Sequence, residues 1–240
     1  MIFSGRYVHT RRDPTGVTTY THMAERTIIL VRHAESTNNV AKRTFKRTLR
    51  RCRLPRSGCE FAQLVSLLTF PMNSPLSRSG QEAVVERRCG CLQLARAHGL
   101  EVVLHSPLMR AFATARGLFG GDVPLERVGQ LYETSLSEHA SIRSLKQRVE
   151  AFKRTLLQRS ESRLAIVGHS GFFRCMIGEA LAQRKHELGN LSVWRVVLGQ
   201  DGVWRDLELL QPGVDLQEVS KTPDQPSTSV GPVCLFMRPD

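Results

Sequence analysis

Residues 27–40 read TIILVRHAESTNNV, an apolar run that ends in charged and hydrogen-bonding side chains. The first five residues are β-branched or aliphatic and do not alternate with polar ones. This pattern is typical of a strand that is buried on both faces of a parallel sheet. Ligands of open α/β sheets bind beyond the carboxyl ends of such strands. The position of Arg32 and His33 directly after the run therefore indicates a functional site.

Strand and helix patterns alternate along the rest of the chain. Residues 74–99 have apolar side chains at helical spacing, with Ser79 as the expected N-cap and an end near Gly99. The further expected elements are a strand over 100–106, a helix with Ser106 and Pro107 as N-cap and first residue, a short strand and loop over 122–133, a helix around 142–159, a strand, turn and helix over 163–181, and a hairpin of 191–199 with 202–210. The alternation predicts an α/β fold of three layers, a mostly parallel sheet with helices on both faces.

Composition divides the chain into three parts. We expect a flexible N-terminal arm over 1–25, a single domain over 26–210 with a basic insertion at 40–60, and a loose tail over 211–240 that is rich in Pro, Ser, Thr and Asp.

No apolar run approaches the roughly 18–20 residues of a membrane span. Residues 1–24 lack the apolar core of a secretory signal, which favours a cytoplasmic location. Their Arg, Ser and Thr content leaves mitochondrial targeting open, and Met23 is an alternative start. The six cysteines show no metal-site spacing and predict reduced thiols.

Positive charge is concentrated in one segment. The chain has 34 Lys and Arg against 22 Asp and Glu, a net charge of +12, and residues 42–56 hold eight basic residues and no acidic one. On a helical wheel the basic residues 42, 43, 46, 47, 50 and 51 share one half, and Ala41 and Phe45 lie on the other. Two interpretations stay open. The segment is a solvated helix whose apolar half packs on the domain, or it attracts polyphosphorylated substrates or an anionic lipid, nucleic-acid or protein surface.

Three expected strands end in groups suited to phosphate chemistry. The first strand leads to Arg32 and His33, the second leads to Arg110 one helical turn later, and the third leads to His169. Parallel strands end at one edge of a sheet, so these groups converge. Arginine forks and helix N-termini favour phosphate-like anions, and a neutral imidazole is a nucleophile near pH 7. The combination predicts phosphoryl transfer through a phosphohistidine.

The same residues resemble a known family. RHAESTNN is similar to the R-H-G-[EQ]-[ST]-x-x-N signature of the histidine phosphatase superfamily, also called phosphoglycerate-mutase-like. PLSRSG, SPLMRAFATA and AIVGHSG resemble its further motifs in the same order. The resemblance implies a doubly wound α/β fold. It also implies that His33 accepts the phosphoryl group, that Glu133 of LYE donates a proton, and that His169 takes part in catalysis. The phosphate-binding residues that it implies are Arg32, Ser36, Asn39, Arg110 and His169. It implies no cofactor and no metal, and a small phosphorylated substrate.

Departures from the family pattern narrow the expected activity. Ala34 replaces the usual glycine, and nothing resembles the aromatic F-T-G-W-x-D stretch of the mutases, which favours a phosphomonoester hydrolase. The alternatives are mutase-type phosphotransfer and a catalytically silent member that binds anionic partners through its basic segment. GHSGF partly matches a serine hydrolase G-x-S-x-G turn, but Phe172 stands at the second glycine and the order of the other triad members fails. The sequence therefore predicts a phosphatase without naming its substrate.

Overall fold

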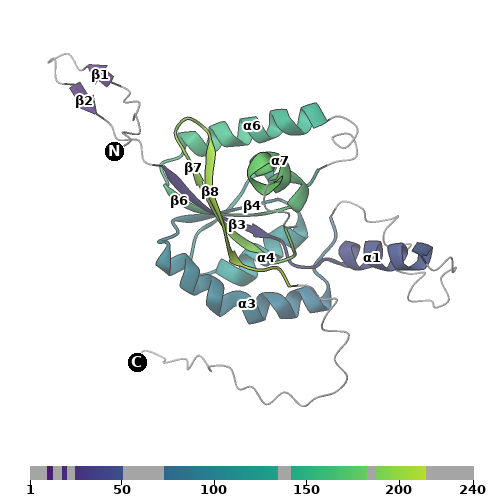
Figure 1. The fold of residues 1–240 in the computed structure, drawn as a ribbon. Helices are drawn as coiled ribbons and strands as arrows, with labels where there is room; N and C mark the ends of the chain where they lie inside the picture. The colour runs from purple at the N-terminus through teal and green to yellow at the C-terminus, as the bar shows by residue number, and fades with distance from the viewer. Residues whose placement is uncertain are drawn as a thin grey trace, which may run out of the picture.

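The computed structural model describes residues 25–50, 73–134, 142–182 and 188–214, with two short strands near the N-terminus (Figure 1). Six strands form the central sheet, in the order β5-β4-β6-β3-β7-β8. Their bounds are β3 Arg26–Arg32, β4 Val102–His105, β5 Leu125–Arg127, β6 Arg163–Gly168, β7 Val193–Leu198 and β8 Trp204–Gln211. The helices are α1 Thr37–Arg50, α3 Arg78–Ala97, α4 Met109–Phe119, α6 Ile142–Gln158 and α7 Ser170–Ala182, with a 3-10 turn, η1, at Gly129–Leu131.

The sheet is mixed and mostly parallel, as predicted. Strands β5, β4, β6 and β3 run parallel to one another, whereas β7 and β8 are antiparallel additions at one side. Register fixes where the strands end. Arg32 of β3 lies opposite Gly168 of β6, and His105 of β4 lies opposite Val167. The residues that follow these three strands therefore emerge side by side at one edge of the sheet.

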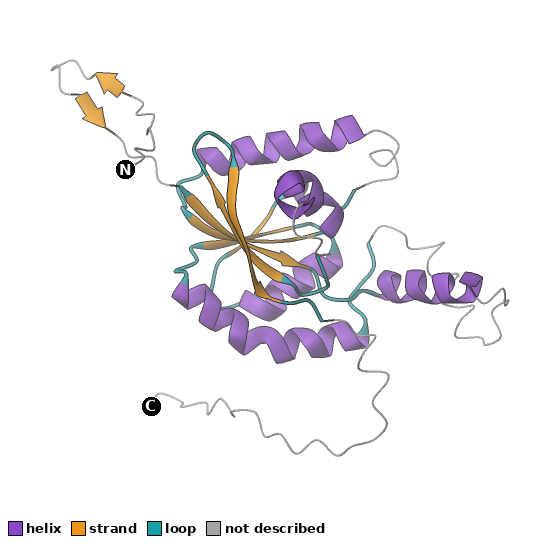
Figure 2. Cartoon of the chain, in the orientation of Figure 1, coloured by secondary structure: helices purple, strands orange, loops and turns teal. Residues whose placement is uncertain are grey.

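Helices cover both faces of the sheet and give three layers (Figure 2). Helices α6 and α7 bury Phe152, Phe172 and Phe173 against one face, together with Trp194 of β7. Helices α3 and α4 cover the other face with smaller side chains, among them a buried Ala115. Because β3 packs on both sides, its run of apolar residues shows no alternation. The expected three-layer α/β fold is confirmed.

Two predicted helix caps are wrong. Ser77, and not Ser79, is the N-cap of α3, where its Oγ accepts a hydrogen bond from Gly80 N at 3.0 Å. Helix α4 begins at Met109 with Leu108 as N-cap, so Ser106 and Pro107 precede it. In both cases a tertiary contact decides the outcome. The hydroxyl of Ser79 bonds to the Glu35 carboxylate at 2.8 Å, and that of Ser106 lies 2.9 Å from Nε2 of His169.

Helix α1 leaves the domain soon after it begins (Figure 1). Ala41 in its second turn is buried, but Phe45 is 39% exposed. The apolar half of the predicted helix therefore does not pack on the domain at Phe45. Residues 51–60 of the expected basic insertion lie outside the described residues.

The expected terminal parts are only partly described. Strands β1 Thr10–Arg12 and β2 Thr18–Tyr20 pair antiparallel within the expected arm, and residues 215–240 of the expected tail are outside the described part of the chain. The division into an arm, a domain and a tail stays a prediction. Among the helices in the described residues, none combines the length and the apolar character that a membrane crossing requires.

Candidate active site

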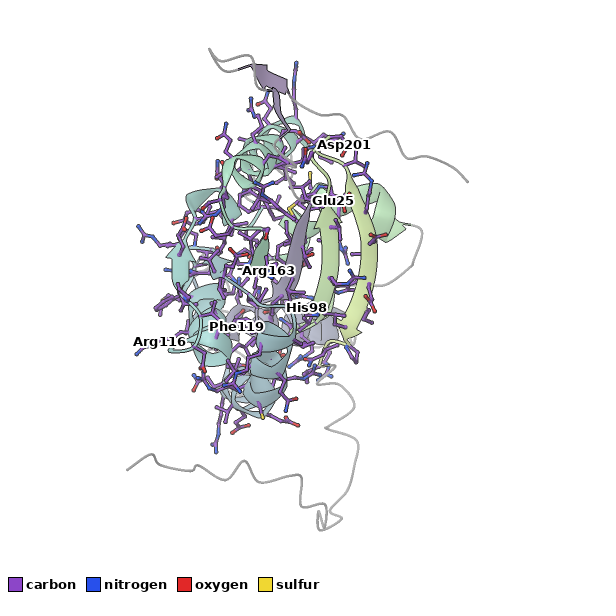
Figure 3. All side chains as sticks on the ribbon, turned by 90° about the vertical axis from the view of Figure 1, so that its left-hand side faces the viewer. Glu25, His98, Arg116, Phe119, Arg163 and Asp201 are labelled. Atoms are coloured by element: carbon purple, nitrogen blue, oxygen red, sulfur yellow. The ribbon has the colours of Figure 1, made fainter. Side chains whose placement is uncertain are left out.

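The candidate site lies where β3, β4 and β6 end. His33 follows β3, Ser106 follows β4 and His169 follows β6, while Arg110 comes from the first turn of α4. The opposite edge of the sheet carries no part of it. Figure 3 views that opposite end, where labelled Glu25 precedes β3 and labelled Arg163 begins β6. The structure thus brings together the three strand ends that the sequence predicted to converge.

The imidazole of His33 is buried and held in one tautomer. Its Nδ1 lies 2.7 Å from the carbonyl oxygen of Ala34. A carbonyl only accepts hydrogen bonds, so Nδ1 carries the hydrogen and the lone pair of the neutral ring is on Nε2. Burial, followed by the charge of Arg110, lowers the pKa of His33 to about 3. His33 is therefore neutral near pH 7, with Nε2 as the nucleophilic atom.

His169 faces His33 across the site. The two ring centroids are 5.0 Å apart, and His169 is fully buried. Ser106 Oγ lies 2.9 Å from Nε2, and Nδ1 lies 4.0 Å from Oε2 of Glu133. When Ser106 donates to Nε2, the hydrogen of the neutral ring resides on Nδ1 and points into the site. Burial and the nearby charges lower the pKa of His169 well below its usual value, so the resting ring is neutral.

Arg110 and Glu133 complete the group of reactive side chains. The Arg110 guanidinium is almost fully buried and forms an ion pair with the half-buried Glu133 carboxylate. Glu133 also faces His169, so one carboxylate meets both a fixed cation and a candidate hydrogen-bond donor. The structure therefore places Glu133 beside Arg110 and His169, while its role as proton donor stays a prediction. Glu138, which follows five residues later and is an alternative candidate for the proton donor, lies outside the described residues.

The segment that carries Glu133 is fixed by Arg148 of α6. Nη1 of Arg148 donates to the carbonyl oxygens of Gln130 at 2.6 Å and Tyr132 at 2.7 Å. The guanidinium also lies 5.0 Å from the centre of the Phe172 ring, which is buried in the first turn of α7. Arg148 therefore links the backbone before Glu133 to the helix that follows His169. This role of Arg148 was not predictable from the sequence, since α6 carries several other basic residues.

Further hydrogen bonds hold the backbone around His33 to the segment after α7 and to α4. Arg32 is half-buried, and its Nη1 donates to the carbonyl oxygen of Leu188. Nδ2 of Asn190 donates to the backbone oxygen of His33 at 2.8 Å. Thr114 of α4 accepts a hydrogen bond from Ala34 N at 3.0 Å. Backbone contacts of this kind leave no sequence pattern, so Asn190 and Thr114 were not predicted.

Ser36 and Asn39 form the cap of α1. Ser36 Oγ accepts from Asn39 N at 3.3 Å, and the side-chain oxygen of Asn39 accepts from Ser36 N at 3.1 Å and from Ser36 Oγ at 2.8 Å. The pair is a reciprocal cap in which asparagine takes the place of the usual Glu or Gln. It fixes the turn that follows His33. Phosphate binding by these two residues stays a prediction.

Glu35 is a structural anchor that the sequence did not reveal. Its carboxylate is buried and accepts hydrogen bonds from Ser77 Oγ at 3.0 Å and Ser79 Oγ at 2.8 Å, and it pairs with Arg43 of α1. A Cβ on Gly80 would lie 2.1 Å from the backbone oxygen of Glu35. The PLSRSG motif therefore supplies two hydroxyls and a close backbone approach that hold the segment beside His33.

The arrangement combines a neutral nucleophile with fixed positive charge. Arg110 supplies the buried charge, and a neutral His169 adds a donor. Such donors in a water-poor site stabilise charge that develops on phosphoryl oxygens. Within the described ranges of the chain, no three His, Cys, Asp or Glu side chains group closely enough to hold a metal ion.

Comparison with known proteins finds solved structures of similar fold but no match by sequence. No family model matches the sequence, and no curated protein matches it significantly. Among solved structures, a candidate alpha-ribazole-5'-P phosphatase from Escherichia coli aligns with 80% of this chain and 100% of its own, with a TM-score of 0.52 and 18% identity. A phosphoserine phosphatase from Entamoeba histolytica aligns with a TM-score of 0.50 and 17% identity. The alignment covers 78% of this chain and 98% of the phosphatase. A phosphoglycerate mutase from Bacillus anthracis aligns with a TM-score of 0.51 and 18% identity. The alignment covers 78% of this chain and 93% of the mutase.

The chain shares the fold of these phosphatases and of the phosphoglycerate mutase. The resemblance first noted in the sequence motifs is thereby confirmed for the fold. Identities of 17–18% carry the fold of these proteins to this chain but not a substrate or an activity. The roles of individual residues therefore rest on the geometry of this site.

Proposed function

We propose that this chain is a phosphomonoester hydrolase that acts through a phosphohistidine on Nε2 of His33. The observation that carries the proposal is the neutral His33 ring, whose Nδ1 is held by the Ala34 carbonyl while Nε2 keeps its lone pair. Arg110 and His169 lie around it, as an in-line attack on a phosphoryl group requires. A phosphorylated metabolite or another polyanion is the proposed substrate class.

In the first step Nε2 of His33 bonds to phosphorus, and the bond from phosphorus to the alcohol oxygen breaks. Arg110, Arg32 and His169 stabilise the negative charge on the three equatorial oxygens. Removing one such donor typically costs about 3–4 kcal/mol of transition-state stabilisation. The Ala34 carbonyl oxygen accepts a hydrogen bond from Nδ1–H of His33 throughout and stabilises the ring as it gains positive charge.

Glu133 supplies the proton for the departing alcohol. In the ligand-free site its carboxylate pairs with Arg110. A phosphoryl dianion competes for that guanidinium and places negative charge beside the carboxyl, which favours the protonated form. In the second step the Glu133 carboxylate takes a proton from water, the water oxygen bonds to phosphorus, and the bond to Nε2 breaks. His33 returns to its neutral tautomer and phosphate leaves.

The test is a screen of purified protein against phosphomonoesters with and without EDTA, followed by rapid acid-free quench with labelled substrate. We expect hydrolysis in EDTA and base-stable, acid-labile label on His33. His33→Ala abolishes turnover, whereas the control His98→Gln, at the opposite end of the molecule (Figure 3), retains it. Full activity in His33→Ala would show that the mechanism is wrong. Transfer of label to an added alcohol in place of water would support mutase-type chemistry.

A further inference from the structure

Helix α1 presents a row of cations that the proposed reaction does not use. Lys42, Lys46 and Arg47 are exposed along the part of α1 that leaves the domain (Figure 1). Within residues 25–50, 73–134, 142–182 and 188–214, none of the three forms an ion pair or a side-chain hydrogen bond. Like charges at this spacing repel each other, so they do not stabilise the helix itself. Their charge is available to an anion from outside the chain.

The orientation of this row is fixed relative to His33. Asn39, Lys42, Arg43 and Lys46 lie three and four residues apart and so share one face of α1. Arg43 on that face pairs with Glu35, two residues after His33. The positive charge of Lys42 also acts on the His33 ring, where it helps to lower the pKa. The cationic face therefore begins beside the catalytic segment and continues outward from it.

The spacing of the row suits a substrate with more than one anionic group. A helix rises 1.5 Å per residue, so Lys42 and Lys46 are separated by about 6 Å along the axis. The scissile phosphoryl group at His33 is served by Arg110 and Arg32. A second anionic group on the same molecule would meet Lys42 first and Lys46 one turn further out.

We propose that Lys42 and Lys46 form a subsite for a second anionic group of the substrate, so that the preferred substrates are small phosphomonoesters bearing another phosphate or carboxylate. The inference rests on the proposed function in that it takes the anion site at His33 as the place of the scissile group. It goes further by naming the substrate class and the residues that select it.

The experiment separates the subsite from catalysis by using ligands that cannot be hydrolysed. Propylphosphonate and propane-1,3-bisphosphonate carry one and two phosphonates on the same short chain, and calorimetry gives their dissociation constants for the full chain. For the unmodified protein at low salt we expect about tenfold tighter binding of the bisphosphonate. The preference shrinks as ionic strength rises, because exposed charges are screened.

Variants then assign the preference to α1. In the double variant Lys42→Gln with Lys46→Gln, the ratio of the two dissociation constants falls to about two, the statistical factor for two equivalent groups. The control Arg154→Gln removes an exposed cation from α6, near the end of that helix that lies away from His169, and keeps the full ratio. A double variant with an unchanged ratio, or an unmodified protein without a preference, would overturn the subsite.

Activity distinguishes this failure from failure of the proposed function. Hydrolysis of p-nitrophenyl phosphate and of a sugar bisphosphate with equal salt dependence would refute the subsite and leave the phosphatase in place. A bisphosphonate preference without any hydrolysis would support the subsite and refute the phosphatase activity. If the lysine variant instead loses binding to anionic vesicles or to an oligonucleotide while the bisphosphonate preference persists, α1 docks on a macromolecule and the subsite is wrong.

Discussion

Mild acid should destabilise the folded chain through His33. Burial and nearby cations lower the pKa of this ring to about 3, whereas an unfolded chain has the ordinary value of 6.5. The unfolded state therefore binds a proton that the folded state rejects, and stability falls as the pH falls below 6.5. Between pH 7.5 and 5.0 linkage gives a loss of about 2 kcal/mol in the free energy of unfolding for this one group. His169 shifts in the same direction and adds to the loss.

The assay is urea unfolding at both pH values for the unmodified protein and for His33→Gln. The variant should lose about 2 kcal/mol less over this interval, because its side chain takes up no proton. Asn190→Ala is the matched control. It deletes the hydrogen bond to the His33 backbone, costs about 1 kcal/mol at both pH values, and keeps the pH difference.

The chosen pH interval isolates the histidine effect. Glu101, Glu161 and Asp201 also have lowered pKa values, but their ordinary values of 4.5 and 3.8 place most of their proton uptake below pH 5. An equal pH difference in His33→Gln and in the unmodified protein would refute the reasoning. The folded state would then protonate His33 readily, and a neutral nucleophile at pH 7 would lose its support.

Three further predictions concern the segments around the site. Glu133→Gln should slow alkyl phosphates by about 100-fold or more and activated aryl phosphates far less, measured as kcat; equal losses would move the proton-donor role elsewhere, with Glu138 first. Arg148→Met should give the same leaving-group dependence at about tenfold, with partial rescue in Arg148→Lys, because Arg148 holds the two carbonyls before Glu133; a uniform loss would indicate general destabilisation. Gly80→Ala should lower stability by about 3 kcal/mol in thermal unfolding, since its Cβ would meet the Glu35 carbonyl at 2.1 Å, and an unchanged Tm would contradict this contact.

The convergence of the site was predictable because it follows from topology alone. Unbroken apolar runs identified β3 and β6 as strands buried on both faces, and buried parallel strands end at a common edge. His33 and His169 are therefore neighbours although 136 positions separate them in the sequence. Arg110 follows for the same reason, since α4 begins just beyond β4. Periodicity and chain direction were sufficient information at this level.

Contacts made by single side chains were not predictable from the same information. Ser77 and Ser79 are equivalent as candidate caps in the sequence. In the structure both hydroxyls donate to the Glu35 carboxylate, and only Ser77 also caps the helix, an outcome that depends on the position of Glu35 in space. Ser106 has good cap chemistry, yet its hydroxyl serves His169. Propensity is a weak preference that a buried partner overrides, because an unsatisfied buried carboxylate or imidazole costs more than a cap contributes.

Burial, and after it the cations that suit the site to a phosphoryl group, lower the pKa of both histidines and set their charge state. Arg110 and Arg32 both act to lower the pKa of His33 and of His169 while the site is empty. A phosphoryl dianion beside them offsets that positive charge, so its binding raises the proton affinity of His169 again. In the proposed reaction, the empty site thus keeps His33 neutral for attack, and the occupied site favours a protonated His169 that can donate to the phosphoryl oxygens. Binding and protonation are thereby coupled, and the affinity for inorganic sulfate, which stays a dianion over this range, should strengthen as the pH falls from 8 to 6, accompanied by proton uptake in calorimetry. Binding without proton uptake, at an affinity that does not vary with pH, would contradict this coupling.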